Sequence, residues 1–342
     1  MLPVRSALIA IDAMSGDRPV ADRLAGVTLA LRHSSRLRVE LVGRRKELSA
    51  WLETLDPETR KRVSIIHADD VIGMDEPVAQ VIRGRPDSSL RRVLERVAGE
   101  HVDGCVSCGN TAALVGLSRL LLKSLPGIDR PALCASLPAD NGHTWVLDLG
   151  ANVTSSADQL VQFAAMGAAL ASAVDENPSP RVGLVNIGSE NSKGGDSVRQ
   201  AGSILAGSGL NYIGFVEGDD FYSGRCDVAV CDGFVGNVSL KASEGISRLM
   251  LNKLRSRLKG SAGKKLAGWV VGPVLRRLLA DLDPRNYNGA CLIGLDGIVV
   301  KSHGNSDAHA FAMALHYAEL EAERDINALI RQRLAQSGHG TY

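Results

Sequence analysis

The sequence predicts an α/β protein in which a mainly parallel β-sheet lies between two layers of helices, a three-layer α/β/α sandwich. Short apolar runs rich in Val and Ile recur along the chain, as expected of buried strands. Segments with helical spacing of apolar residues fall between them, for example 87–100 and 157–175. Most of the apolar runs end in Gly with Asp or Asn, so turns follow the strands.

Nine segments are expected to form strands, because each is a short apolar run bounded by turn residues. The last of them contains Ile298 to Val300 and leads through the polar sequence "KSHGNSD" into a helix with Phe311 and Leu315 on one face. In chain order the nine segments are 7–12, 37–43, 63–68, 103–109, 144–150, 181–188, 212–218, 226–233 and 297–302.

The polar residues that follow these strands are the first functional signal. Turn chemistry explains any one of them, because Gly supplies positive φ and Asp or Asn caps the next helix. In open α/β sheets, however, ligands bind at the carboxyl ends of strands, near exposed N–H groups and helix N-termini. Several such loops at one sheet edge could therefore line a single cleft with amides, carboxylates and at least one lysine.

Composition limits the classes of function. The 342 residues hold 39 basic and 38 acidic side chains, so the net charge of +1 gives no reason to expect nucleic acid as a partner. No stretch approaches the roughly 18 apolar residues of a spanning helix, and we expect a cytoplasmic protein. The six cysteines lie mostly in apolar runs and are interpreted as buried thiols. Cys105 and Cys108 lack a second pair at ligand spacing, so no metal site is predicted.

The abrupt change in composition at 246–280 predicts a projecting segment within one catalytic unit that spans 1–342. It has nine basic residues and no acidic one, with leucines on one helical face. A basic amphipathic helix with an apolar tip can lie on an anionic membrane, or it can pack against a partner subunit, and both can hold. The residues expected to make these contacts are Lys253, Arg255, Arg257, Lys259, Lys264, Lys265, Trp269, Val270 and Val271.

Common catalytic fingerprints are missing. The chain has no G-x-G-x-x-G after a strand, no G-x-x-x-x-G-K-[ST], no G-x-S-x-G and no H-E-x-x-H. An enzyme without these motifs can use a reaction in which the substrate supplies its own nucleophile.

As a set, several stretches resemble the phosphate acyltransferase family PlsX. They include "IDAMSGD" (11–17), "GNTAAL" (109–114), "LDLGANV" (147–153), "VGLVNIGSENSKG" (182–194), "VAVCDGFVGNVSLKASEG" (228–245) and "GIVVKSHGNSDAHAF" (297–311). The match runs from the first expected strand to the last helix. It departs from the usual family pattern at Ser15, Pro19 and Cys108.

The resemblance implies a fold like that of isocitrate dehydrogenase and phosphate acetyltransferase, with two lobes around a cleft, usually as a homodimer. It implies transfer of an acyl chain from acyl carrier protein to inorganic phosphate, giving the acyl phosphate used in phospholipid synthesis, with no cofactor. Phosphate would attack the thioester directly, without a covalent enzyme intermediate. The implied partners also include the inner face of an anionic membrane, on which the protein associates peripherally, and the downstream glycerol-3-phosphate acyltransferase.

The chemistry of the motifs assigns four residues to catalysis. Lys301 at a strand end can pair with a phosphate dianion. His303 can hold a phosphate oxygen or assist proton transfer, or it can be a structural hydrogen-bonding group. Asn237 can stabilise the oxyanion with its amide. Asp232 would orient Lys301 or Asn237, or cap the helix.

Further residues are expected to bind phosphate or substrate. Asp12 and Asp17 would line the cleft as orienting carboxylates, and Lys193 is a second cation for phosphate or phosphopantetheine. The full set is Asp12, Asp17, Gly109, Asn110, Thr111, Gly188, Lys193, Gly233, Gly236, Ser302, Gly304, Asn305 and Ser306.

Two other functions stay open from the sequence. One is an NAD-dependent decarboxylating dehydrogenase of the same fold, which would need clustered acids for a divalent metal and several arginines. The other is a non-catalytic scaffold on a membrane surface, which would depend on segment 246–280.

Overall fold

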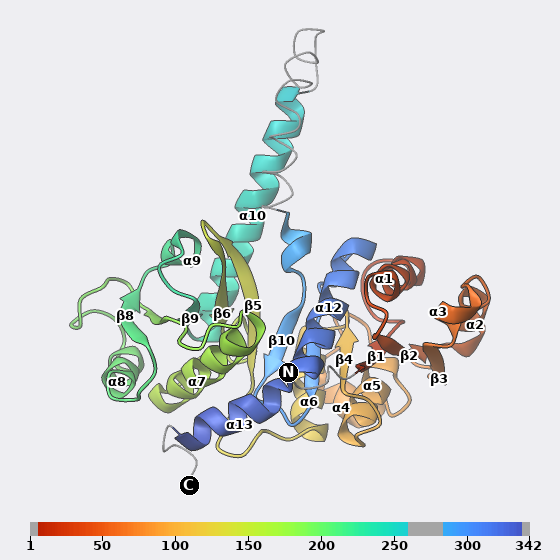
Figure 1. Ribbon diagram of the computed structural model, residues 1–342, viewed down its shortest axis with the longest axis horizontal. Helices are drawn as coiled ribbons and strands as arrows, with labels where there is room; N and C mark the ends of the chain where they lie inside the picture. The colour runs from red at the N-terminus through yellow and green to blue at the C-terminus, as the bar shows by residue number, and fades with distance from the viewer. Residues whose placement is uncertain (1–5, 259–282, 337–342) are drawn as a thin grey trace.

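The computed structural model describes residues 6–258 and 283–336 of the chain (Figure 1). These residues form one sheet of eleven strands in the order β3-β2-β1-β4-β11-β10-β5-β6-β9-β7-β8. The strands are β1 (Leu8–Asp12), β2 (Arg38–Gly43), β3 (Val63–His67), β4 (Gly104–Ser107), β5 (Ala132–Ala139), β6 (Gly142–Leu147), β7 (Val182–Val185), β8 (Tyr212–Val216), β9 (Val228–Val230), β10 (Ala290–Ile293) and β11 (Ile298–Lys301).

Helices cover both faces of the sheet, which confirms the three-layer α/β/α prediction. One hydrophobic core joins the sheet to α1, α7, α8, α12 and α13, and a second core on the other face joins it to α4, α5, α6 and α9. The helices are α1 (Val20–His33), α2 (Arg45–Leu52), α3 (Pro57–Arg60), α4 (Val78–Gly84), α5 (Ser89–Ala98), α6 (Thr111–Leu121), α7 (Ala157–Val174), α8 (Asp196–Leu205), α9 (Asp220–Ser223), α10 (Gly233–Leu258), α12 (Ala308–Arg324) and α13 (Ile326–Gln336), with a 3-10 turn η1 (Pro284–Tyr287).

The sheet consists of two parallel halves that run in opposite directions. Strands β3, β2, β1, β4 and β11 are parallel to one another, as are β6, β9, β7 and β8. Strands β10 and β5 join the halves through antiparallel pairing. The sequence predicted the nine strands of the two halves but not these two. Strand β5 carries a proline and forms a hairpin with β6, and β10 is followed by β11 with no helix between them, so neither has the pattern of a strand that alternates with helices.

The register brings the ends of both halves into one row across the sheet. Strands β1, β4 and β11 each extend one residue past this row, and β6 and β9 end on it. From one half to the other the paired residues are Leu41, Ile11, Val106, Val300, Cys291, Cys134, Leu147, Val230 and Leu184. The polar loops of the two halves therefore leave the sheet at the same level.

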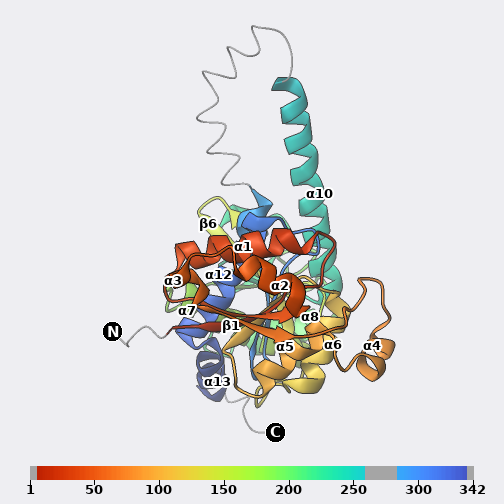
Figure 2. The ribbon, with the colours of Figure 1, turned by 90° about the vertical axis from the view of Figure 1, so that its right-hand side faces the viewer.

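Two helices, α7 and α10, have features that matter for contact with a membrane. Helix α7 is long and apolar enough to cross a bilayer, but 72% of it is buried inside the protein, where it packs between the sheet and α13. Helix α10 instead projects far beyond the body of the molecule (Figures 1 and 2). Of the contact residues expected at 246–280, Lys253 is exposed on α10, and positions 259–271 lie outside the described residues.

Candidate active site

Lys301 is the last residue of β11 and is only 8% exposed. Its Nζ donates to the carbonyl oxygen of Cys108 at 3.5 Å and to that of Ser302. No carboxylate lies within ion-pair distance of this ammonium among the ion pairs of the described residues. Burial lowers the pKa of Lys301 to about 8. A buried ammonium held by carbonyl groups alone is able to bind an anion.

The loop after β11 is held by Asn288, a residue that the sequence did not predict. The Asn288 amide donates to Ser302 Oγ at 2.8 Å, and its oxygen accepts from the backbone N–H of His303 at 3.0 Å. Ser302 and Ser306 lie 2.9 Å apart through their hydroxyls, and both are buried. This network fixes the path of the polar loop, and the substrate contacts expected of Ser302 and Ser306 stay a prediction.

The imidazole of His303 is oriented by its own loop. Its Nδ1 accepts the backbone N–H of Asn305 at 3.1 Å. Burial lowers the pKa of His303, and the positive charge of Lys241 lowers it further. The ring is therefore neutral at pH 7 and carries its proton on Nε2, which makes it a hydrogen-bond donor to an anion.

The first loop and the last loop are joined through Gly304. Its carbonyl accepts the backbone N–H of Asp17 at 2.8 Å, and a Cβ on Gly304 would lie 2.4 Å from Asp17 Oδ2. Asp17 is exposed, whereas Asp12 is fully buried and accepts from Ser107 Oγ at 2.7 Å. Asp12 thus ties β1 to β4, and Asp17 stands at the edge of the site.

Arg23 is a second buried cation beside these loops, and the sequence did not predict it. It is 2% exposed and donates to the carbonyls of Ala13, Arg18 and Met14 at 2.8, 3.0 and 3.2 Å. The guanidinium holds the backbone that carries Gly16, where φ is +119°.

The predicted residues after β4 begin helix α6. The Gly109 N–H donates to Ser107 Oγ at 2.9 Å, and the Asn110 side chain caps the helix through the N–H of Ala113 at 3.0 Å. Asn110 also donates to the Met74 carbonyl at 2.6 Å. Thr111 is exposed at the first helical position, where free N–H groups favour anions.

Asp148 organises the loop after β6, and its role was not predicted. The buried carboxylate accepts backbone N–H groups of Leu133, Gly150, Ala151 and Asn152 at 2.7 to 3.1 Å and the Asn152 amide at 2.9 Å. Burial raises the pKa of Asp148, and these hydrogen bonds oppose the rise.

The loop after β6 holds the start of α10. The Asn152 carbonyl accepts the Gly233 N–H at 2.8 Å, and a Cβ on Gly236 would lie 1.9 Å from the Asp148 carbonyl oxygen. Only glycine allows this approach. The side chain of Asn237 is exposed next to Gly150, and no hydrogen bond of the described residues occupies its amide.

Asp232 caps α10, because its Oδ1 accepts the Val235 N–H at 2.8 Å. None of the hydrogen bonds found among the described residues joins Asp232 to Lys301 or Asn237. The structure therefore shows a hydrogen bond for the helix-capping role of Asp232. Its role in orienting Lys301 or Asn237 stays a prediction.

Lys193 lies in an exposed loop after β7 and pairs with Glu190 at 2.8 Å. Its Glu190 partner raises the pKa of Lys193. Gly188 is buried beneath this pair. Neither residue contacts the loops around Lys301 through a described hydrogen bond or ion pair, so their substrate role stays a prediction.

The six cysteines are free and buried. Burial raises the pKa of Cys108, which Ser302, Lys301 and Arg23 oppose. No cluster of three or more His, Cys, Asp or Glu residues suited to a metal occurs in the part of the chain that the structure describes.

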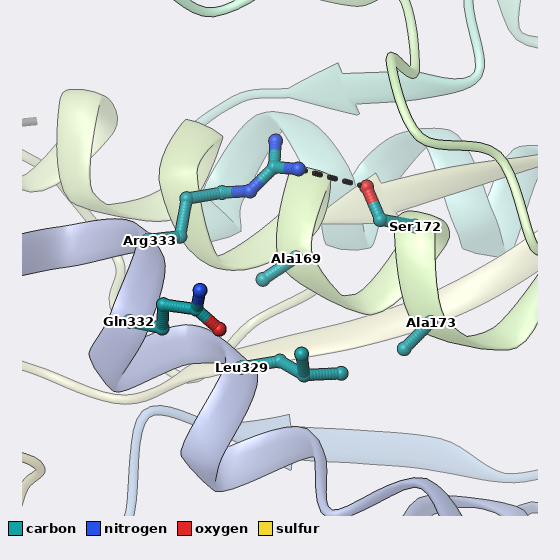
Figure 3. Close-up of a pocket in the computed structure, with 6 residues that line it drawn as sticks. All are labelled: Ala169, Ser172, Ala173, Leu329, Gln332 and Arg333. Carbon is teal, nitrogen blue, oxygen red and sulfur yellow. Dashed lines mark hydrogen bonds between the residues drawn. The ribbon is translucent and has the colours of Figure 1, made fainter. Parts of the chain in front are cut away.

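A cavity of about 190 Å³ lies elsewhere, between α7 and α13 (Figure 3). Arg333 lines it and donates to Ser172 Oγ at 3.0 Å. None of the predicted site residues lines this cavity, so it is separate from the loops described above.

Comparisons with known proteins agree over almost the whole chain. The family model described as "Fatty acid synthesis protein" matches residues 7–329. A phosphate acyltransferase of Alcanivorax borkumensis is 45% identical over 331 residues, covering 96% of this chain and 98% of the relative. A phosphate acyltransferase of Nitrosococcus oceani is 46% identical and covers 94% of each chain. A solved phosphotransacetylase from Streptococcus pyogenes has a TM-score of 0.62 at 18% identity, covering 93% and 94%, which shows a shared fold.

Proposed function

The chain belongs to the phosphate acyltransferase family, and from this premise we propose that it transfers the acyl group of an acyl carrier protein thioester to inorganic phosphate. The products are acyl phosphate and free carrier protein, in phospholipid synthesis. Family membership favours this reaction over the dehydrogenase and scaffold alternatives.

The observation that carries the proposal is the buried ammonium of Lys301. It stands at the carboxyl end of β11, within reach of carbonyl groups and without a carboxylate partner in the described part of the chain. A charge buried in this way lowers the stability of the protein unless an anion arrives. Inorganic phosphate is an anion small enough to reach such a strand end.

The reaction needs positioning more than a protein nucleophile. A phosphate oxygen forms the new bond to the thioester carbon, the carbon–sulfur bond breaks, and the proton of hydrogen phosphate passes to the departing thiolate. A thiol has a pKa of about 8.5, so its thiolate leaves without a strong general acid. No covalent enzyme intermediate is required.

Two side chains can act on the developing charge. The amide of Asn237, to which no hydrogen bond is found in the described part of the chain, can donate to the oxyanion of the tetrahedral intermediate. The Nε2–H of neutral His303 can donate to a phosphate oxygen, which favours a binding role over that of a base.

The projecting α10 supports the proposed assembly. It carries exposed apolar side chains at Val238 (51%), Ile246 (53%) and Leu249 (50%), and we propose that a second copy of the chain covers them in a homodimer. Exposed Arg248 and Lys253 favour peripheral contact of α10 with an anionic membrane on the cytoplasmic side. Contact with a downstream glycerol-3-phosphate acyltransferase is part of the same proposal.

The test is release of carrier-protein thiol from a long-chain acyl carrier protein, with and without inorganic phosphate, with hydroxylamine present to trap acyl phosphate. We expect thiol release that depends on phosphate together with a trapped acyl product. Thiol release that does not depend on phosphate, or the absence of thiol release by folded protein, would refute acyl phosphate synthesis.

A further inference from the structure

Large apolar side chains are exposed where α10 leaves the body of the protein (Figure 1). Phe234, the second residue of α10, is 64% exposed, and Val153 in the loop after β6 is 72% exposed. The backbone N–H of Phe234 donates to the Val153 carbonyl at 3.3 Å, so the two residues are neighbours in space. Single apolar residues are common on protein surfaces, but adjoining ones are typical of a binding surface.

A third exposed apolar residue belongs to the same edge of the sheet. Ile187, in the loop after β7, is 77% exposed. Strand β9 lies between β6 and β7, and its Val230 pairs with Leu147 on one side and Leu184 on the other. Because α10 follows β9, the loops after β6 and β7 leave the sheet on either side of its first turn. We call Val153, Ile187 and Phe234 the apolar rim.

The backbone under Phe234 is held on several sides. The N–H of Gly233 donates to the Asn152 carbonyl at 2.8 Å, and the N–H of Val235 donates to Asp232 Oδ1 at 2.8 Å. A Cβ on Gly236 would meet the Asp148 carbonyl oxygen, so this turn of the helix lies directly against the loop after β6. Phe234 is therefore presented to solvent by a fixed part of the fold.

The apolar rim continues into the residue proposed to hold the oxyanion. Phe234 and Asn237 are three residues apart on α10, so they lie on the same side of the helix. The loop that carries Val153 also reaches Asn237, because a Cβ on Gly150 would lie 3.5 Å from the Asn237 Cβ. The apolar side chains and the free amide thus share one loop and one helical turn.

An acyl thioester matches this order of groups. Its carbonyl oxygen needs a hydrogen-bond donor in the transition state, and its aliphatic chain begins at the same carbonyl carbon. We propose that the apolar rim binds the acyl chain of the donor, which would run from Asn237 over Phe234 and Val153. This inference rests on the proposed function, because the chain belongs to the thioester of that reaction.

The rim is separate from the outer part of α10 that a second copy is proposed to cover. Ile246 and Leu249 lie twelve and fifteen residues after Phe234, or about 18 and 22 Å further along the helix axis. Val153 and Ile187 are not on α10 at all, but in the loops at the end of the sheet where ligands of α/β proteins bind. A long aliphatic chain therefore fits the rim better than the outer helix does.

The first experiment varies the length of the acyl chain. Each buried methylene strengthens binding by about fourfold, so contact with the rim should favour long chains. The measurement is kcat/KM for hexadecanoyl carrier protein divided by kcat/KM for butyryl carrier protein. We expect Phe234→Ala to lower this ratio by about tenfold, the effect of losing contact with about two methylenes. Leu120→Ala is the matched control, since Leu120 is 54% exposed near the end of α6, and it should keep the wild-type ratio.

Val153→Thr tests the second residue of the rim without changing the branched shape of its side chain. The added hydroxyl makes contact with an aliphatic chain less favourable, so the ratio should fall in the same direction, by about threefold. Both variants change exposed side chains and should keep the urea midpoint of wild type. A wild-type ratio in folded Phe234→Ala and Val153→Thr would overturn the site for the acyl chain.

A binding measurement separates this inference from the proposed function. Dodecyl phosphonate carries a long chain on an anionic group, and methyl phosphonate carries the group alone. Dodecyl phosphonate should raise the melting temperature of wild type and Leu120→Ala more than methyl phosphonate does, and this difference should shrink in Phe234→Ala. If wild type made no acyl phosphate but kept the difference, the proposed function would fail and the apolar site would stand.

Light scattering tests the rival occupant, a second copy of the chain. Phe234→Ala should have the same mass as wild type at the same protein concentration. A smaller mass would assign the apolar rim to the second copy and overturn its role in binding the acyl chain.

Discussion

The carbonyl oxygen of Gly304 accepts the backbone N–H of Asp17 at 2.8 Å, which locks the loop after the last strand of the sheet to the loop after the first. The two residues are 287 positions apart in the sequence. The two residues are also close beyond this hydrogen bond, because the Cα of Gly304 faces the side-chain carboxylate of Asp17. The position of Lys301 therefore depends on a glycine three residues later.

Gly304→Ala should damage the site through this contact. A Cβ at 2.4 Å from Asp17 Oδ2 must displace this exposed carboxylate, and because the end of a flexible side chain moves more easily than a core, we expect about 1 kcal/mol, the low end of the cost of overpacking. We expect lower kcat and a lower urea midpoint. Gly218→Ala is the matched control, since no atom lies within 4 Å of its added Cβ. Equal urea midpoints for the two variants would contradict a stabilising role of the contact between Gly304 and Asp17.

Lys301→Met should abolish turnover while making the folded protein more stable at pH 7. The fall of the Lys301 pKa from 10.5 to about 8 corresponds to roughly 3 kcal/mol of unfavourable burial, which an apolar chain of similar length removes. The measurement is the unfolding free energy without phosphate. A stability loss in Lys301→Met would show that the ammonium is structural.

The lowered pKa of Lys301 predicts that phosphate binding and stability both change with pH. Its charge is present below about pH 8 and is lost above it, so the KM for phosphate should rise as the pH passes about 8. Between about pH 8 and 10.5 the unfolded chain binds a proton that the folded chain lacks, so the unfolding free energy should increase with pH through this window. Cys108, Asp17, Lys241 and Asp12 also act on this pKa. Lys301→Met should remove the rise of the unfolding free energy between about pH 8 and 10.5, which urea unfolding at several pH values measures.

Asn237→Ala should lower kcat more than it raises the KM for either substrate. Its amide has no hydrogen-bond partner among the described residues, so it is free to bind charge that develops only in the transition state. Asn191→Ala, in the exposed loop after β7, should match wild type. A large rise in KM with unchanged kcat would assign Asn237 to ground-state binding.

Sequence patterns predicted the parts of the site that lie at strand ends. The run Ile298 to Val300 is β-branched and the next residues are polar, so the place of Lys301 followed from the rule that ligands bind where parallel strands end. Asn288 and Asp148 were missed, because their partners are backbone groups of loops whose path no periodicity records.

The remaining prediction concerns the apolar side of α10. Val238, Ile246 and Leu249 are each about half exposed, on a helix that projects from the body (Figure 2). Leu249→Glu places a charge in this stripe, so it should disfavour burial against an apolar surface of a second copy. Light scattering should then find a smaller species than wild type at the same concentration, whereas Arg38→Glu, at the exposed first residue of β2, should leave the mass unchanged. Vesicle sedimentation distinguishes the two proposed surfaces of α10. If Leu249→Glu keeps its mass but loses binding to anionic vesicles, the stripe serves the membrane and the homodimer forms elsewhere.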